Sequence, residues 1–116
     1  MDSILTEVKK KIGIIEEDES FDIDIITDIN AALATLAQIG IGPTEGFFIE
    51  DSSAVWTDFV ADVTVLALVK NYVYMKVRMS FDASSMSSSV LESLKTQISE
   101  YEWRLSLYER ERVTDV

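Results

Sequence analysis

The sequence predicts an all-α domain, a small bundle of about four main helices with an irregular or short β-hairpin excursion around residues 40–53. Apolar residues recur every three or four positions in several segments, as they do on the buried face of a helix. Three of the four glycines and the only proline lie within Gly40–Gly46, so one principal loop interrupts this pattern. With 116 residues, 47% of them hydrophobic, the chain suits one core. We expect a single helical domain over residues 1–109 and a flexible C-terminal tail over residues 110–116.

A short first helix is expected near the start of the chain, capped by Asp2 or Ser3 and ended by Gly13. Its apolar residues follow helical spacing: Ile4, Leu5, Val8 and Ile12.

An acidic run follows, with six carboxylates in nine residues: Glu16, Glu17, Asp18, Glu19, Asp22 and Asp24. The EF-hand template needs a central glycine and a glutamate at its twelfth position, and no register here supplies both. We therefore expect an acidic loop that leads into a second helix rather than a metal site. Ser20 is the expected cap, and the helix repeats apolar residues until Gly40: Ile26, Ile29, Leu33 and Leu36.

Phe47, Phe48 and Ile49 follow the principal loop and can form a brief strand or fill the core. The functional alternative is an exposed aromatic tip used for docking, because loops often carry binding residues. Phe47 and Phe48 are therefore candidates for a partner interface. A further helical turn, capped by Ser52 or Ser53, is expected after them: Val55, Trp56, Phe59 and Val60.

The segment from Asp62 to Ser80 is expected to form a long helix that is apolar almost all round in its first half. Such a helix must be covered on several sides, and part of this cover can come from a neighbouring subunit. The valines leave a β alternative open.

Five serines between Ser84 and Ser89 mark a break, whose last serines are expected to cap the final helix. That helix carries an apolar heptad stripe, which packs against the preceding helix or against itself in an oligomer: Leu91, Leu94, Ile98, Tyr101, Leu105 and Tyr108.

Trp103 lies outside this stripe, roughly 200° round the helix from Tyr101. With Leu107 it makes a second apolar patch. A tryptophan beside Arg104 is typical of interface hot spots, although a tryptophan that completes the core is an equally ordinary alternative. Three further interface candidates lie in or near the tail: Tyr108, Arg110 and Arg112.

Composition excludes several classes of function. The chain has no cysteine and no histidine, which removes thiolate and imidazole metal sites and the common nucleophile pairs. Carboxylates such as Glu100 and Glu102 are two residues apart and do not point together on a helix. We predict no enzyme, no catalytic residue, no cofactor and no metal.

The formal net charge of −11 disfavours diffuse electrostatic attraction to the phosphates of nucleic acid or to anionic lipid. The longest apolar run, Val63 to Val69, is too short to span a membrane, so no membrane partner is expected.

Two elements in the second half of the chain are distinctive in combination. A tyrosine-rich segment with lysine and arginine runs into Phe81 and Asp82, and a helix that closes in Glu-Trp-Arg-Leu follows after a serine-containing gap. This order resembles the head-tail connector family of tailed bacteriophages, also called adaptor or head-completion proteins. That family often has two prolines where this chain has Ala83 and Ser84, so a less rigid turn is expected. The residues that carry the resemblance are Tyr72, Tyr74, Lys76, Arg78, Phe81 and Asp82, then Leu91, Leu94, Gln97, Ile98, Glu102, Trp103, Arg104 and Leu105.

The resemblance implies a structural virion protein of a phage or prophage that self-associates into a ring, dodecameric in the virion, under the portal protein. Such a ring extends the DNA channel and docks a stopper or tail-completion protein, while packaged DNA passes through without specific binding. The expected location is the virion neck, and the host cytoplasm during assembly. An acidic surplus suits a channel wall, and a helix with two apolar faces suits a ring, in which each subunit needs two different complementary surfaces.

An alternative from another class is an acidic DNA-mimic inhibitor of a host nucleic-acid enzyme. Residues 16–24 are its best starting point, because their carboxylates are dense. The other acidic residues are interspersed with lysine and arginine, which counts against it.

Overall fold

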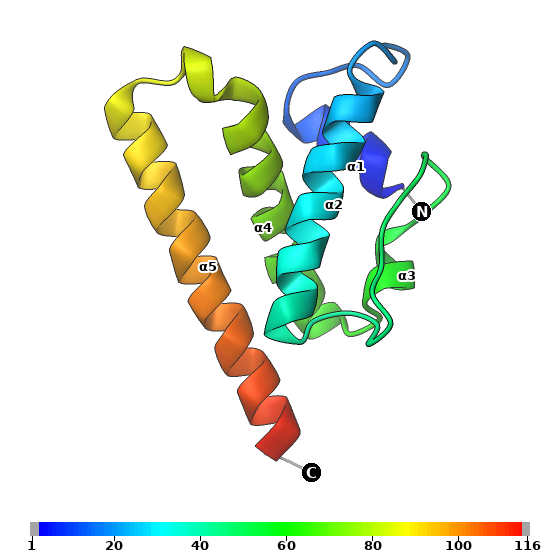
Figure 1. The fold of residues 1–116 in the computed structure, drawn as a ribbon, viewed down its shortest axis with the longest axis vertical. Helices are drawn as coiled ribbons and strands as arrows, with labels where there is room; N and C mark the ends of the chain where they lie inside the picture. The colour runs from blue at the N-terminus through cyan, green and yellow to red at the C-terminus, as the bar shows by residue number, and fades with distance from the viewer. Residues whose placement is uncertain (1–2, 115–116) are drawn as a thin grey trace.

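The protein is a helical bundle (Figure 1). Its computed structural model describes the backbone of residues 3–114 and the side chains of residues 3–111. The all-α prediction is confirmed. The described residues form five α-helices and one short 3₁₀ turn: α1 (Ile4–Lys11), α2 (Asp22–Ile39), α3 (Trp56–Phe59), α4 (Val63–Asp82), η1 (Ala83–Ser85) and α5 (Ser88–Thr114).

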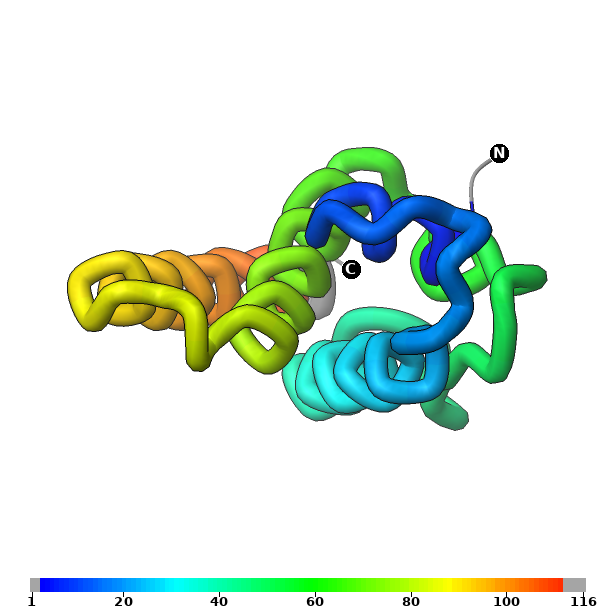
Figure 2. Tube along the Cα trace, turned by 90° about the horizontal axis from the view of Figure 1, so that it is seen from above, coloured from blue at the N-terminus to red at the C-terminus, as the bar shows by residue number. Residues whose placement is uncertain are grey.

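Helix α4 lies at the centre of the bundle. It contacts α1 and α2 on one side and α5 on the other, as the view from above shows (Figure 2). These helices of the same chain cover much of its apolar surface, while Val63 at its first turn is 77% exposed. Cover of the remaining surface by a neighbouring subunit stays a prediction, and the β alternative is wrong. Asp62 caps its start by accepting a hydrogen bond from the Thr64 N–H at 2.8 Å. The buried residues of α4 are Val65, Val69, Tyr72, Val73 and Val77.

The ends of the first two helices follow local rules with one exception. Ser3 caps α1 by accepting a hydrogen bond from the Thr6 N–H at 2.9 Å, as predicted. Gly40 ends α2 in the left-handed conformation, with φ of 105°. The predicted cap Ser20 is wrong, because its N–H and hydroxyl both donate to the Asp18 carboxylate within the acidic loop. Phe21 occupies the capping position instead.

The segment between α2 and α3 is irregular, which is one of the two forms predicted for it, and the alternative of a short β-hairpin is wrong. Among the described residues its only strand-like contact is an isolated bridge between Ser3 and Val55. The reason is the side chain of Asn30, which donates to the Ile49 carbonyl at 3.0 Å and accepts from the Ile49 N–H at 2.7 Å. A side-chain amide thus takes the place of a second strand.

The short helix α3 starts after Val55, whose N–H donates to the Asp58 carboxylate at 3.0 Å. Ser53 does not cap it, because its N–H and hydroxyl both donate to Asp51. The predicted cap at Ser52 or Ser53 is therefore wrong.

The last helix confirms the predicted heptad stripe and its cap. Ser87 accepts a hydrogen bond from the Val90 N–H at 3.2 Å. Leu94, Ile98 and Leu105 are buried, and α5 packs against α4 and α2 of its own chain. Helix α5 continues to Thr114, while residues 115–116 of the predicted tail lie outside the described residues. The flexibility of residues 110–116 stays a prediction.

Candidate partner interface

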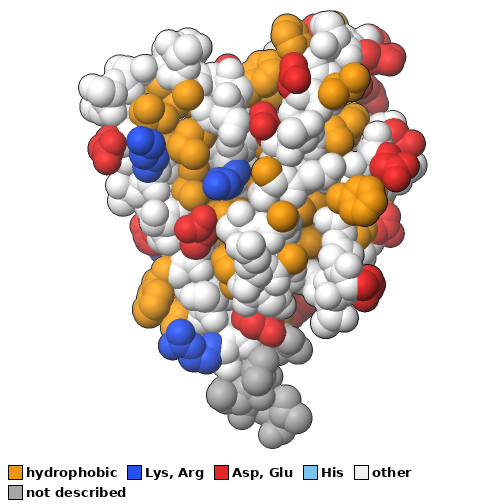
Figure 3. Space-filling view, in the orientation of Figure 1, with side chains coloured by type: hydrophobic (Ala, Val, Ile, Leu, Met, Phe, Trp, Pro, Cys, Tyr) orange, Lys and Arg blue, Asp and Glu red, His pale blue; other side chains and the backbone are white. Residues whose placement is uncertain are grey.

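The outer face of α5 carries an exposed aromatic and basic surface near its C-terminal end. Trp103 is 58% exposed, so it does not complete the core, and Leu107 four residues on is partly exposed. The Arg104 guanidinium pairs with Glu100 one turn earlier at 2.8 Å and lies 5.7 Å from the centre of the Tyr101 ring. Arg110 is also exposed. We call Trp103, Arg104, Leu107 and Arg110 the α5 strip; in Figure 3 hydrophobic and basic side chains adjoin over this part of α5, at the lower left.

The inner face of the same turns is bound to the bundle. The Tyr108 hydroxyl donates to Asp62, and this hydrogen bond lowers the pKa of the Asp62 carboxyl. The Tyr72 hydroxyl donates to Glu102 at 2.7 Å, and burial followed by this bond raises the pKa of Tyr72. Tyr108 therefore packs inward, unlike the α5 strip. The side chain of Arg112, another interface candidate, lies outside the described residues.

The aromatic pair after the principal loop divides between core and surface. Phe47 is half-buried and lies edge-on to Phe59, with 5.4 Å between ring centres. A Cβ atom at Gly42, where φ is +97°, would lie 2.5 Å from the Phe59 ring, so this position requires glycine. Phe48 is 66% exposed. Only Phe48 is available for docking, and the structure does not bring it together with Trp103.

An acidic groove that the sequence did not predict lies near the start of α2. It is a hollow of about 400 Å³ between α1, the acidic loop and residues 50–52. Ile23, one of its apolar lining residues, is 81% exposed. A sequence signal was present in the isoleucines interspersed among the carboxylates of residues 15–24. Apolar Leu5, Ile23 and Ile26 line it together with five carboxylates: Glu16, Glu19, Asp22, Glu50 and Asp51.

Lys9 also lines the acidic groove, but its ammonium already contacts groups of its own chain. Lys9 is only 3% exposed, and its ammonium lies 2.8 Å from Asp22 and donates to the Glu16 carbonyl at 2.9 Å. The ion pair with Asp22 offsets the free-energy cost of burying the charged ammonium of Lys9. The exposed carboxylates Glu16, Glu19 and Glu50 therefore give the groove a negative rim.

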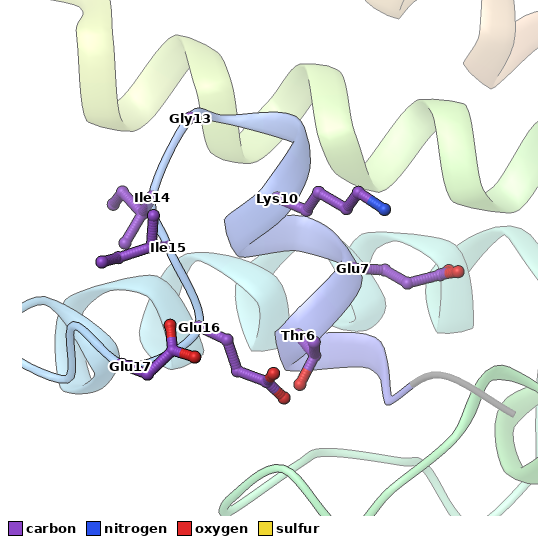
Figure 4. Close-up of a pocket in the computed structure, with 8 residues that line it drawn as sticks. All are labelled: Thr6, Glu7, Lys10, Gly13, Ile14, Ile15, Glu16 and Glu17. Carbon is purple, nitrogen blue, oxygen red and sulfur yellow. The ribbon is translucent and has the colours of Figure 1, made fainter.

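A second hollow, of about 590 Å³, lies beside α1 (Figure 4). In this view Glu7 and Lys10 extend to one side of α1, whereas Glu16 and Glu17 lie on another. One oxygen of Glu7 accepts from the Trp56 indole N–H at 2.6 Å and from the Tyr74 hydroxyl at 3.2 Å. Acid–base catalysis needs two converging groups, and in Figure 4 Glu7 extends away from Glu16 and Glu17.

No group of three possible ligands for a metal ion occurs among the described side chains. Within residues 3–114, none of the helices combines the length and apolarity needed to cross a bilayer.

Comparison with protein families decides the class. A family model described as "Phage connector protein" matches residues 4–112. The chain belongs to the phage connector family. This match confirms the resemblance seen in the sequence, and it spans α1 to α4 and most of α5.

Membership indicates a structural role in joining phage head and tail rather than a catalytic one. It also implies association with other phage head and tail proteins, and a place in the virion neck is consistent with it. Neither the comparison with curated proteins nor that with solved structures yields a match.

Proposed function

We propose that the chain is the adaptor subunit of a phage neck, which forms a ring under the portal protein, extends the DNA channel and docks the stopper or tail-completion protein. The observation that carries this proposal is the match to the connector family over residues 4–112. The expected copy number in the virion is twelve, as the sequence resemblance implies.

The division of surfaces on α5 supports a ring. Its inner face is committed to the chain's own core through Leu94, Ile98 and Leu105, while the α5 strip remains exposed. A ring of identical subunits needs two different complementary surfaces on each subunit, because every contact is heterologous. Helix α5 stabilises the monomer through its inner face and exposes its outer face, so it can supply one of these two surfaces.

The charge supports a channel through which DNA slides. A formal net charge of −11 on each subunit gives the assembled wall a potential that repels phosphates. Binding that depends on phosphate contacts is therefore weak everywhere along the wall, and the genome finds no strong local trap. Packaged DNA passes through without specific binding, and the proteins above and below the ring are the tight partners.

Portal and stopper contacts are assigned to two parts of the chain. The candidates are Phe48 on the irregular segment, which is 66% exposed, and the predicted tail over residues 110–116. An apolar aromatic residue can anchor such a contact, and a terminal segment can order on its partner.

The mass of the full-length protein tests this function. Light scattering is run on the protein alone and with the portal protein of the same phage, each at low and at moderate salt. A ring-sized complex that survives moderate salt supports the adaptor. A chain that ignores the portal at both salt concentrations, but forms a salt-sensitive complex with a DNA-binding enzyme, contradicts it and supports the DNA-mimic alternative.

A further inference from the structure

We infer that the α5 strip of one copy docks into the acidic groove of a second copy of the same chain. This inference deepens the proposed function and rests on it, because it names the two surfaces through which ring neighbours would meet. The complementary chemistry of the two surfaces and their placement on the molecule indicate this contact.

The two surfaces are complementary in chemistry. The strip offers a large aromatic side chain, Trp103, with Arg104 and Arg110 near it. The groove offers an apolar lining that includes Ile23 and Ile26, within a rim of carboxylates. Tryptophan and arginine are the residues that most often anchor protein interfaces, tryptophan by filling an apolar pocket and arginine by pairing with carboxylates.

Arg104 on the strip and the rim carboxylates of the groove can take part in such a contact. The Arg104–Glu100 pair is 52% exposed on each side chain, and an exposed pair of this kind contributes little, so Arg104 can exchange Glu100 for a groove carboxylate at small cost. On the groove side, Asp51 accepts hydrogen bonds from the Ser53 N–H and hydroxyl, which lower the pKa of Asp51 and keep it ionised. The buried ammonium of Lys9 contacts the Asp22 carboxylate and the backbone carbonyl of Glu16, and no ion pair joins it to the rim carboxylates Glu16, Glu19 and Glu50 among the described side chains.

The placement of the two surfaces makes the contact intermolecular. The strip lies on the last turns of α5, whereas the groove lies beside the first turn of α2, at the opposite end of a molecule whose longest extent is 45 Å (Figure 1). One copy cannot join its own strip to its own groove. A contact between different surfaces of two copies repeats head to tail, and it closes into a ring when the rotation between neighbours allows it.

Pairing of two α5 strips is the competing arrangement. It would place Arg104 of one copy near Arg104 of the other, and like charges brought together in an interface oppose association. The groove removes this conflict because its rim is negative. The strip therefore selects the groove over another strip.

A mixing experiment with the full-length protein tests this contact. The strip variant is Trp103→Ala with Arg104→Ala, and the groove variant is Glu16→Lys with Glu19→Lys. Sedimentation velocity over a range of concentrations should show association of the wild type and loss of association for each variant alone. An equimolar mixture of the variants should form a heterodimer of about 26 kDa, from two chains of 13.1 kDa each, because each variant retains one intact surface.

The mixture should stop at the dimer, since the two remaining surfaces are both damaged. Val90→Ala is the control: Val90 is 48% exposed on the same helix but away from the strip, and this variant should associate like the wild type. Circular dichroism melting checks that each variant is folded.

Three results would overturn the inference: a wild type that stays monomeric at every concentration, variants that associate as strongly as the wild type, or a mixture that yields only monomers. The proposed function is tested separately by the portal. Variants that form wild-type complexes with the portal would reject these surfaces and leave the adaptor function standing. A wild type that self-associates through them but ignores the portal would reject the adaptor function alone.

Discussion

The two tryptophans of the chain lie in regions of opposite character. Trp56 is 2% exposed, and its indole N–H donates to Glu7 at 2.6 Å. The Tyr74 ring meets it edge-on at 6.0 Å, and the Lys70 ammonium lies 5.9 Å from its centre. Trp103 stands on the outer face of α5 and is 58% exposed. The same residue type thus serves the fold in one place and is available to a partner in the other.

The difference follows from how many elements surround each site. Three helices, α1, α3 and α4, converge on Trp56 and satisfy its polar atom as well as its ring. Helix α5 packs mainly on α4 and α2, and Trp103 on its outer face is mostly exposed. Substitutions in the two regions should therefore separate stability from association.

The largest effect is expected for Trp56→Ala. Removing a buried tryptophan leaves a cavity and costs roughly 3–5 kcal/mol of unfolding free energy. Urea denaturation followed by circular dichroism measures this loss. A cost below about 1 kcal/mol would show that the region around Trp56 is not the rigid part of the fold.

A smaller loss is expected for Glu7→Ala. This change leaves the Trp56 indole N–H and the Tyr74 hydroxyl without their shared acceptor, and hydrogen bonds to charged groups contribute roughly 1.5–3 kcal/mol each at most. We expect a loss of about 2 kcal/mol in the same denaturation experiment. Glu17→Ala, at an exposed carboxylate, is the matched control and should change stability by less than about 0.5 kcal/mol. Equal losses of stability for the two variants would show that the hydrogen bonds to Glu7 do not stabilise the region around Trp56.

An effect of about 1 kcal/mol at neutral pH is expected for Tyr72→Phe, which removes the bond that joins α4 to Glu102 on α5. The pKa of Tyr72 is raised in the folded protein above its ordinary value of 10.0. Its contribution is therefore fully present below pH 10 and is lost as the pH rises through the folded pKa.

The deficit of Tyr72→Phe relative to the wild type should accordingly shrink above about pH 10. Denaturation curves recorded at several alkaline pH values measure this change. Tyr101→Phe controls for the loss of a tyrosine at the same pair of helices. A deficit that stays constant across this range would contradict the assignment of Tyr72.

The smallest effect on stability is expected for Trp103→Ala. The side chain is mostly exposed, so its removal should change the free energy of unfolding by less than about 0.5 kcal/mol. The same variant should associate more weakly than the wild type, as measured by sedimentation velocity. A loss of 2 kcal/mol or more in stability would place Trp103 in the core and end the contrast with Trp56.

The sequence by itself determined the helices and the family. Apolar spacing of three and four residues located α1, α2, α4 and α5, and Ser3, Gly40 and the last serines of the break marked their ends. These features depend on neighbours within one or two turns, so a linear pattern is enough to predict them. The family could be recognised from the sequence for a similar reason: the motifs between Tyr72 and Leu105 follow one another along the chain, so no knowledge of the packing is needed to compare them.

Only the tertiary structure decided which aromatic residues are available to a partner. Phe47 packs on Phe59 while its neighbour Phe48 is exposed, and no local rule distinguishes the two. Of the two forms predicted for residues 40–53, the irregular one was confirmed and the hairpin was not, because Asn30, 19 residues away, satisfies the backbone of Ile49. Glu7 likewise reaches Trp56, 49 residues along the chain. Contacts of this length depend on how the helices pack, and packing sums many small terms that local spacing does not encode.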